Sequence, residues 1–223
     1  MRVLRVFAFS ASHLSTSSAL RSRSFAGLPA PTVAARLRAT LEAAGARLSP
    51  EALATDDPLE VFRSSAALGD DLNQLALRTL MELEMKAAGT ARLTPGATDL
   101  MQRARGKGMS VGIVSNNSVA AVTTFLDREG LSGQADYISA RSAADPALMK
   151  PNPHLLHQAL RHLSADPSSA LLVGDSVTDV EASKLAGVVA VGYANKPVKV
   201  ARLGAAGAAL IVTSIEDLAN ALT

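Results

Sequence analysis

The chain has 223 residues, of which 48% are hydrophobic and 19% are charged. A chain of this length buries roughly three-quarters of its unfolded surface when it folds. It is expected to form one domain with an insertion or two small domains. A net charge of +2, an aromatic content of 3% and the lack of Trp argue against a nucleic-acid-binding surface. The lack of Cys excludes disulfides and thiolate chemistry and is compatible with a cytoplasmic location, and no apolar run approaches the roughly 20 residues that cross a membrane as a helix.

The N-terminal region is rich in Arg and Ser and contains no acid. No Asp or Glu precedes Glu42, and Ser is dense from Ser10 to Ser24. This composition is typical of an organelle transit peptide, which gives one interpretation, a precursor whose first 25 residues are removed. The other interpretation is a first strand over Val3 to Phe9 followed by a solvated loop. We favour the strand, because the fold inferred below requires one here.

The next region carries helical periodicity without any strand signal. Apolar side chains recur every four residues at Val33, Leu37 and Leu41, and similar periodicity predicts helices over 32–44, 59–68 and 72–88. An all-helical unit of about 60 residues is therefore expected between the first strand and the rest of the chain.

From Thr94 onward, short apolar strands alternate with helices. Strands are predicted over 110–114, 135–139, 170–173, 188–193 and 210–212, and helices over 95–105, 118–129, 153–163, 177–186, 198–203 and 215–222. The Ala- and Gly-rich segment 204–209 is expected to form a turn. Such alternation is typical of a parallel sheet with right-handed crossovers, so the fold class is α/β.

Polar residues follow two of the predicted strands. Ser115, Asn116, Asn117 and Ser118 come after the strand over 111–114, where a hydroxyl and backbone N–H groups at a helix start can bind an anion. Capping by Ser118 explains the same segment without any ligand. Lys150 precedes another predicted helix and can neutralise a phosphate, although a single lysine is more often only solvated.

The segment Leu171–Asp179 is the most informative stretch of the chain. Its apolar run breaks at Gly174 and is followed by Asp175 and Asp179, at the strand end where open α/β sheets bind ligands. Two carboxylates there suit a hard cation such as Mg²⁺. Taken alone, Asp179 is also explained as an acid that complements the helix dipole.

In their order and spacing these segments resemble motifs II, III and IV of the haloacid dehalogenase superfamily. Residues 174–179, followed by Ala186-Gly187, form one specific match, and residues 150–153 form a second. The resemblance covers about residues 93–223, and the helical insertion is similar to the small cap of that family's phosphatases. It implies a Rossmann-like three-layer core with a parallel sheet, formed by residues 1–24 and 91–223, with an inserted all-helical cap over residues 25–90.

The resemblance also implies an activity, Mg²⁺-dependent hydrolysis of a small phosphorylated metabolite through an aspartyl-phosphate. Ser115 and Asn116 would bind the phosphate, and Lys150 would neutralise it. Asp175 would ligate Mg²⁺. Asp179 would either ligate the ion as well or support the site without contacting the ion. Neither nucleic acid nor a membrane is an expected partner, and the oligomeric state is left open.

The family's first motif, a strand that ends in Asp-x-Asp-Gly, is absent. No Asp precedes Asp56. One placement of the motif puts Ala8 and Ser10 at the positions of the nucleophile and the general acid/base, and the other puts Thr16 and Ser18 there. Neither placement supplies a carboxylate, so we expect hydrolysis to be impaired in the chain as written.

Three explanations of the missing motif remain open. The chain is a catalytically silent binding or regulatory protein, or another residue serves as the nucleophile, or the N-terminal reading is out of frame. If Ser15-Thr16-Ser17 is read one base earlier, the degenerate code permits Phe-Asp-Phe, with Gly at Ala19 but no second Asp at Ser18.

Overall fold

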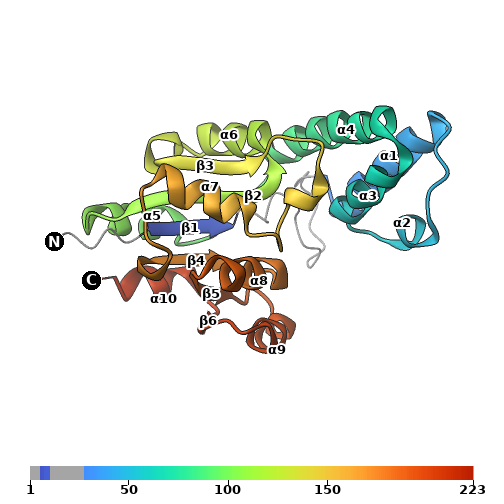
Figure 1. The fold of residues 1–223 in the computed structure, drawn as a ribbon. Coiled ribbons are helices and arrows are strands. Elements are labelled where there is room, and N and C mark those ends of the chain that lie inside the picture. The colour runs from blue at the N-terminus through green and yellow to red at the C-terminus, as the bar shows by residue number, and fades with distance from the viewer. Residues whose placement is uncertain (1–5, 11–27, 223) are drawn as a thin grey trace.

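A six-stranded, all-parallel sheet forms the centre of the protein (Figure 1). The computed structural model describes residues 6–10 and 28–222. The strand order is β3-β2-β1-β4-β5-β6, in which β1 lies between β2 and β4. The strands are β1 (Val6–Ser10), β2 (Ser110–Ser118), β3 (Tyr137–Arg141), β4 (Ala170–Gly174), β5 (Val189–Tyr193) and β6 (Leu210–Val212). The order reverses direction beside β1, and such a reversal is where doubly wound sheets bind ligands.

Helices cover both faces of this sheet. One layer consists of α5 (Ala97–Gly106), α6 (Val119–Arg128) and α10 (Ile215–Asn220), and the other of α7 (His154–His162), α8 (Val177–Ala186) and α9 (Pro197–Ala206). The strands supply both cores because alternate side chains point to opposite faces. In β2, Ile113 packs with the first layer and Val114 with α7 and α8.

Among the described residues between β1 and α5, four helices form a separate unit. They are α1 (Ala30–Ala43), α2 (Pro50–Ala54), α3 (Pro58–Ser65) and α4 (Asp70–Ala88). Leu37, Leu41, Phe62 and Leu80 are fully buried in a core of their own. Helix α4 also packs against α6, so the helical unit is joined to the end of the sheet where the strands finish (Figure 1).

The predicted α/β class and its parallel sheet are confirmed. Helix α8 has the predicted bounds, and Gly187 ends it in the left-handed conformation that glycine adopts at little cost. The first strand is confirmed for the described residues 6–10. The alternative placement of the missing motif, at residues 15–19, lies outside the described residues.

Three local predictions were wrong. Strand β2 continues to Ser118 instead of ending at Val114, with an irregularity in its pairing to β3 between Ser115 and Ser118. Residues 204–206 belong to helix α9, because Gly207 and not Gly204 takes the left-handed conformation that ends it. The short helix α2 had no predicted counterpart, since five residues are too few to display a helical period.

Candidate active site

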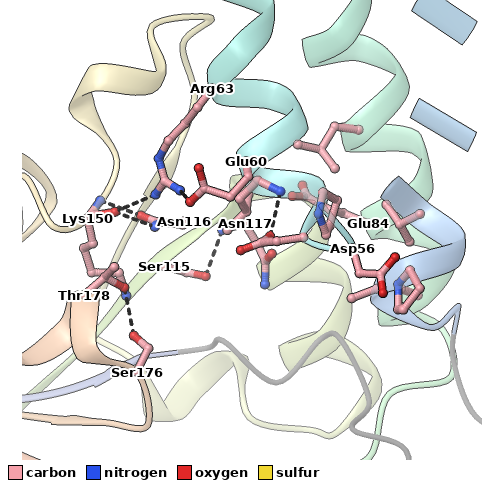
Figure 2. Close-up of a pocket in the computed structure, with 18 of the residues that line it drawn as sticks. Asp56, Glu60, Arg63, Glu84, Ser115, Asn116, Asn117, Lys150, Ser176 and Thr178 are labelled. Carbon is pink, nitrogen blue, oxygen red and sulfur yellow. Dashed lines mark hydrogen bonds and ion pairs between the residues drawn. The ribbon is translucent and has the colours of Figure 1, made fainter. Parts of the chain in front are cut away.

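A cavity of about 560 Å³ lies between the carboxyl edge of the sheet and the helical unit. The sheet edge contributes residues 115–117, Lys150 and the beginning of α8, while α1, α3 and α4 contribute the opposite wall. Figure 2 shows polar side chains from both sides directed toward one another across this space. The volume falls within the range of small-molecule pockets.

The end of β2 presents Ser115 and Asn116 to the cavity. Ser115 is almost completely buried, and its hydroxyl oxygen accepts a hydrogen bond from the backbone N–H of Asn117, with an N–O distance of 3.1 Å. Ser118 caps α6 by accepting from the backbone N–H of Ala121. The capping interpretation of Ser118 is therefore confirmed, while Ser115 and Asn116 line the cavity beside it.

The side-chain amide of Asn116 holds the backbone of Lys150 in place. The Lys150 N–H donates to Asn116 Oδ1 at 2.8 Å, and Asn116 Nδ2 donates to the Lys150 carbonyl at 3.1 Å. These two bonds join the end of β2 to a loop that follows it by more than thirty residues. The sequence motifs that contain Ser115 and Lys150 are thus brought together by one amide.

Lys150 is a buried lysine at the base of the cavity. Its Nζ donates to the Val114 carbonyl at 3.0 Å and to Asp179 Oδ1 at 2.6 Å. A buried ammonium group requires such partners, because desolvation of an unpaired charge costs several kcal/mol. The pairing keeps a positively charged group beside the strand ends, in the lining of the cavity.

Asp179 supports this lysine from the first turn of α8. Its side chain is only 1% exposed, and its Oδ2 accepts from both the backbone N–H and the hydroxyl of Ser176, at 3.1 and 2.6 Å. Ser176 in turn caps the helix by accepting from the Asp179 N–H. Both carboxylate oxygens of Asp179 are therefore engaged within the protein.

Asp175, at the end of β4, is paired with a lysine from another helix. Its carboxylate is 7% exposed and forms an ion pair with Lys199 from the beginning of α9. Burial, together with the negative charges of Asp175 and Glu216, raises the pKa of the nearby Tyr193 phenol above its ordinary value.

The helical unit reaches the site through two charged side chains that the sequence did not indicate. Arg63 of α3 donates to the Lys150 carbonyl at 2.9 Å and pairs with Glu60 (Figure 2). Glu84 of α4 is buried and pairs with Arg141 at 2.6 Å. Glu84 also accepts from the Ser118 N–H, so α4 is bonded to the end of β2.

Arg141 completes this network behind the cavity. Its Nε donates to the Asn116 carbonyl at 3.0 Å, and its guanidinium lies over the ring of Phe62. Glu84 was not predicted, although one sequence feature could have indicated it: it is a charged residue on the otherwise apolar face of its helix. No comparable signal marked Arg63, Arg141 or Lys199, because their partners come from distant parts of the chain.

The donor set fits Mg²⁺ in one specific way. Within the described residues, no three His, Cys, Asp or Glu side chains meet as a metal site. Mg²⁺, however, is often held by one or two carboxylates together with substrate phosphate oxygens and waters. Asp175 can supply one such carboxylate. The described residues do not fit a site in which protein carboxylates alone hold the metal.

The first strand, β1, lies between β2 and β4 in the sheet. β1 is in register with β2 and β4, and Ser10 lies opposite Val114. Its sequence, Val-Phe-Ala-Phe-Ser, contains no acid. In the part of the chain that the model describes, no helix has the length and apolarity of a membrane span.

Several curated proteins of similar sequence carry phosphatase names. The chain is 35% identical over 161 residues to a protein named phosphoglycolate phosphatase from Rhodospirillum rubrum, a match that covers 66% of this chain and 65% of the relative. It is 34% identical over 100 residues to another of that name from Synechococcus elongatus, which covers 45% of each. The matched segments thus span about half to two thirds of the relatives' length.

Solved structures show the same fold over nearly the whole chain. A hydrolase from Pseudomonas syringae matches with a TM-score of 0.70 and 18% identity, covering 97% of this chain and 96% of the other. CbbY from Rhodobacter sphaeroides, in complex with xylulose-(1,5)bisphosphate, matches with a TM-score of 0.63 and 19% identity, covering 96% and 95%. Finally, the profile of the family described as haloacid dehalogenase-like hydrolase matches residues 54–193. Since this match covers more than half of the chain, the protein belongs to the family of haloacid dehalogenase-like hydrolases.

Proposed function

We propose that this protein binds the phosphate group of a small phosphorylated metabolite in the cavity at the sheet edge, and that its hydrolysis of that group is impaired. The observation that carries the proposal is the buried Lys150, held by Val114 and Asp179 beside Ser115 and Asn116. A charged group of this kind is costly to bury and is typical of a functional site.

In the proposed complex, Lys150 neutralises a phosphate oxygen as a point charge. The Ser115 hydroxyl and the Asn116 backbone N–H bind further oxygens. Asp179 keeps Lys150 in position, since both of its carboxylate oxygens already accept bonds within the protein. Asp179 was expected either to ligate Mg²⁺ or to support the site. The hydrogen bonds favour the supporting role.

Asp175 is the residue that would hold Mg²⁺. Such an ion, when bound, orients a phosphate and offsets its charge. The chain's own contribution is to present one carboxylate at the end of β4, next to Ser176 and the cavity. We propose that binding of the ion depends on phosphate oxygens to complete its ligands.

Impaired hydrolysis follows from the sequence of β1. An enzyme that works through a covalent nucleophile loses on the order of 10⁴ to 10⁶ in rate when that residue is removed. Neither Ala8 nor Ser10 can replace a carboxylate nucleophile and a carboxylate acid/base. The same observation favours a second candidate function, a catalytically silent protein that uses the pocket for binding or regulation.

The names of the relatives suggest phosphoglycolate as the first ligand to test. Helices α1–α4 are proposed to act as the cap expected over residues 25–90, because α1, α3 and α4 form the wall of the cavity opposite the strand ends. Arg63, the basic side chain on this wall that bonds the Lys150 loop, would lie closest to the part of the ligand beyond its phosphate.

Isothermal titration with inorganic phosphate and with phosphoglycolate, with and without Mg²⁺, tests the proposal. Binding is expected in the unmodified protein and should weaken at least about tenfold in Ser115→Ala and Lys150→Met, because each removes a group that contacts the anion. The exposed Lys184 provides a matched control, Lys184→Met, which should bind normally. Lys150→Met removes the ion-pair partner of Asp179, so circular dichroism is used to check that this variant still folds. If phosphate binding is absent, or is equal in Ser115→Ala and in the unmodified protein, the proposed site is wrong.

A further inference from the structure

Lys199 reaches the proposed metal-binding carboxylate from a separate helix. Strand β5 pairs with β4, and α9 begins four residues after β5 ends, at the same edge of the sheet (Figure 1). This path carries Lys199 to Asp175, with which it forms an ion pair. Neither residue is among those that line the cavity itself.

The position of Lys199 within its helix is unfavourable by itself. It lies in the first turn of α9, which contains no acidic residue. The N-terminus of a helix carries a partial positive charge, so a cation in the first turn is disfavoured. The Asp175 carboxylate offsets this cost, which indicates that the placement of the lysine is tied to that acid.

The two partners differ in exposure. The Asp175 side chain is 7% exposed, whereas that of Lys199 is 26% exposed. A nearly buried carboxylate needs a countercharge close by. Lysine, on its flexible four-carbon stem, can leave such a contact for solvent without moving the backbone.

We propose that Lys199 is a tethered counterion that competes with a divalent cation for the Asp175 carboxylate. In the metal-free protein its ammonium group neutralises Asp175. When a divalent cation binds Asp175, the ammonium group moves toward solvent. This inference rests on the metal-binding role given to Asp175 under the proposed function.

Competition of this kind lowers the affinity of the site for metal. Removing the ammonium group should therefore tighten metal binding. Two opposite charges in contact near a protein surface attract each other, and solvent screens this attraction only in part at the partly exposed Lys199. We therefore expect the affinity for Mg²⁺ to increase about tenfold when the ammonium group is removed. Retaining a cation at the same position should keep the affinity low.

The experiment is a titration with Mg²⁺ at a saturating concentration of inorganic phosphate, followed by calorimetry. Lys199→Met is expected to bind Mg²⁺ about tenfold more tightly than the unmodified protein. Lys199→Arg should stay within about threefold of the unmodified protein, because the positive charge is kept. Adding Asp175→Asn to Lys199→Met should abolish the gain, and Lys184→Met, at an exposed position of α8, should change nothing.

Equal or weaker Mg²⁺ binding in Lys199→Met, or a gain that survives Asp175→Asn, would overturn the inference. So would tight binding by Lys199→Arg. Phosphate binding measured in the presence of a chelator separates this result from the proposed function. Loss of that binding contradicts the phosphate site, whereas intact phosphate binding with an unchanged Mg²⁺ affinity contradicts only the role of Lys199.

Discussion

Gly174 determines how closely Asp179 approaches the end of β4. A Cβ atom added at this position would lie 2.5 Å from the Asp179 Cβ and 2.7 Å from its Cγ. Contacts this short force the aspartate away, and Lys150 then loses its buried partner. We expect Gly174→Ala to destabilise the fold by about 3 kcal/mol, the scale for breaking a buried ion pair, and to weaken phosphate binding.

Urea unfolding and phosphate titration check this expectation. Gly133→Ala is the matched control, since a Cβ atom there meets nothing within 4 Å. Unchanged stability and phosphate affinity in Gly174→Ala would show that the carboxylate of Asp179 is not held in place by this close approach.

At the residue scale, the sequence predicted Ser115, Lys150 and Asp179 at the sheet edge and missed Arg63 on helix α3 and Arg141 at the end of strand β3. Ser115, Lys150 and Asp179 come together because parallel strands end at one edge, so their positions follow from the order of the elements. Arg63 and Arg141 depend on how distant segments dock. Local periodicity contains no information about such docking.

At the scale of elements, α4 is fixed to the end of the sheet by the Glu84–Arg141 pair. Both side chains are buried, and the pair also bonds the backbone of Ser118 and Asn116. Removing one partner leaves an uncompensated buried charge, whereas removing both does not. We expect Glu84→Ala to cost about 3 kcal/mol of unfolding free energy.

The double variant Glu84→Ala/Arg141→Met should recover a large part of this loss, which a double-mutant cycle in urea measures. Asp99→Ala, which breaks an exposed pair with Arg103, serves as the control and should cost no more than about 1 kcal/mol. Simple additivity of the two buried substitutions would contradict the coupling of α4 to the sheet.

The bounds of an element were predicted correctly where a residue that ends helices, such as glycine, stands at the actual end of the element. Helix α8 ends before Gly187, as predicted, and the structure shows that Ser176 caps its beginning. Strand β2 was predicted too short, since its last four residues are polar and pair irregularly with β3. The segment after Leu203 was predicted as a turn, although a single glycine does not end a helix unless the backbone turns left-handed there.

For the whole molecule, the parallel α/β core was predictable because strands and helices alternate with regular spacing. The placement of the helical unit over the strand ends was not, since it depends on packing between α4 and α6 and on the Glu84–Arg141 pair. In the resulting molecule, the buried Lys150 and Asp179 line a cavity, and Asp175 lies beside it. The central strand, by contrast, contains no acidic residue.

The central claim is therefore that the chain retains the phosphate-binding side of a phosphoryl-transfer site and lacks its nucleophile. The most direct test is the rate of p-nitrophenyl phosphate hydrolysis with Mg²⁺, measured for the unmodified protein beside Asp175→Asn. The account predicts equal rates, because neither protein has a carboxylate on β1 to attack the phosphate. Robust Mg²⁺-dependent turnover that disappears in Asp175→Asn would contradict it.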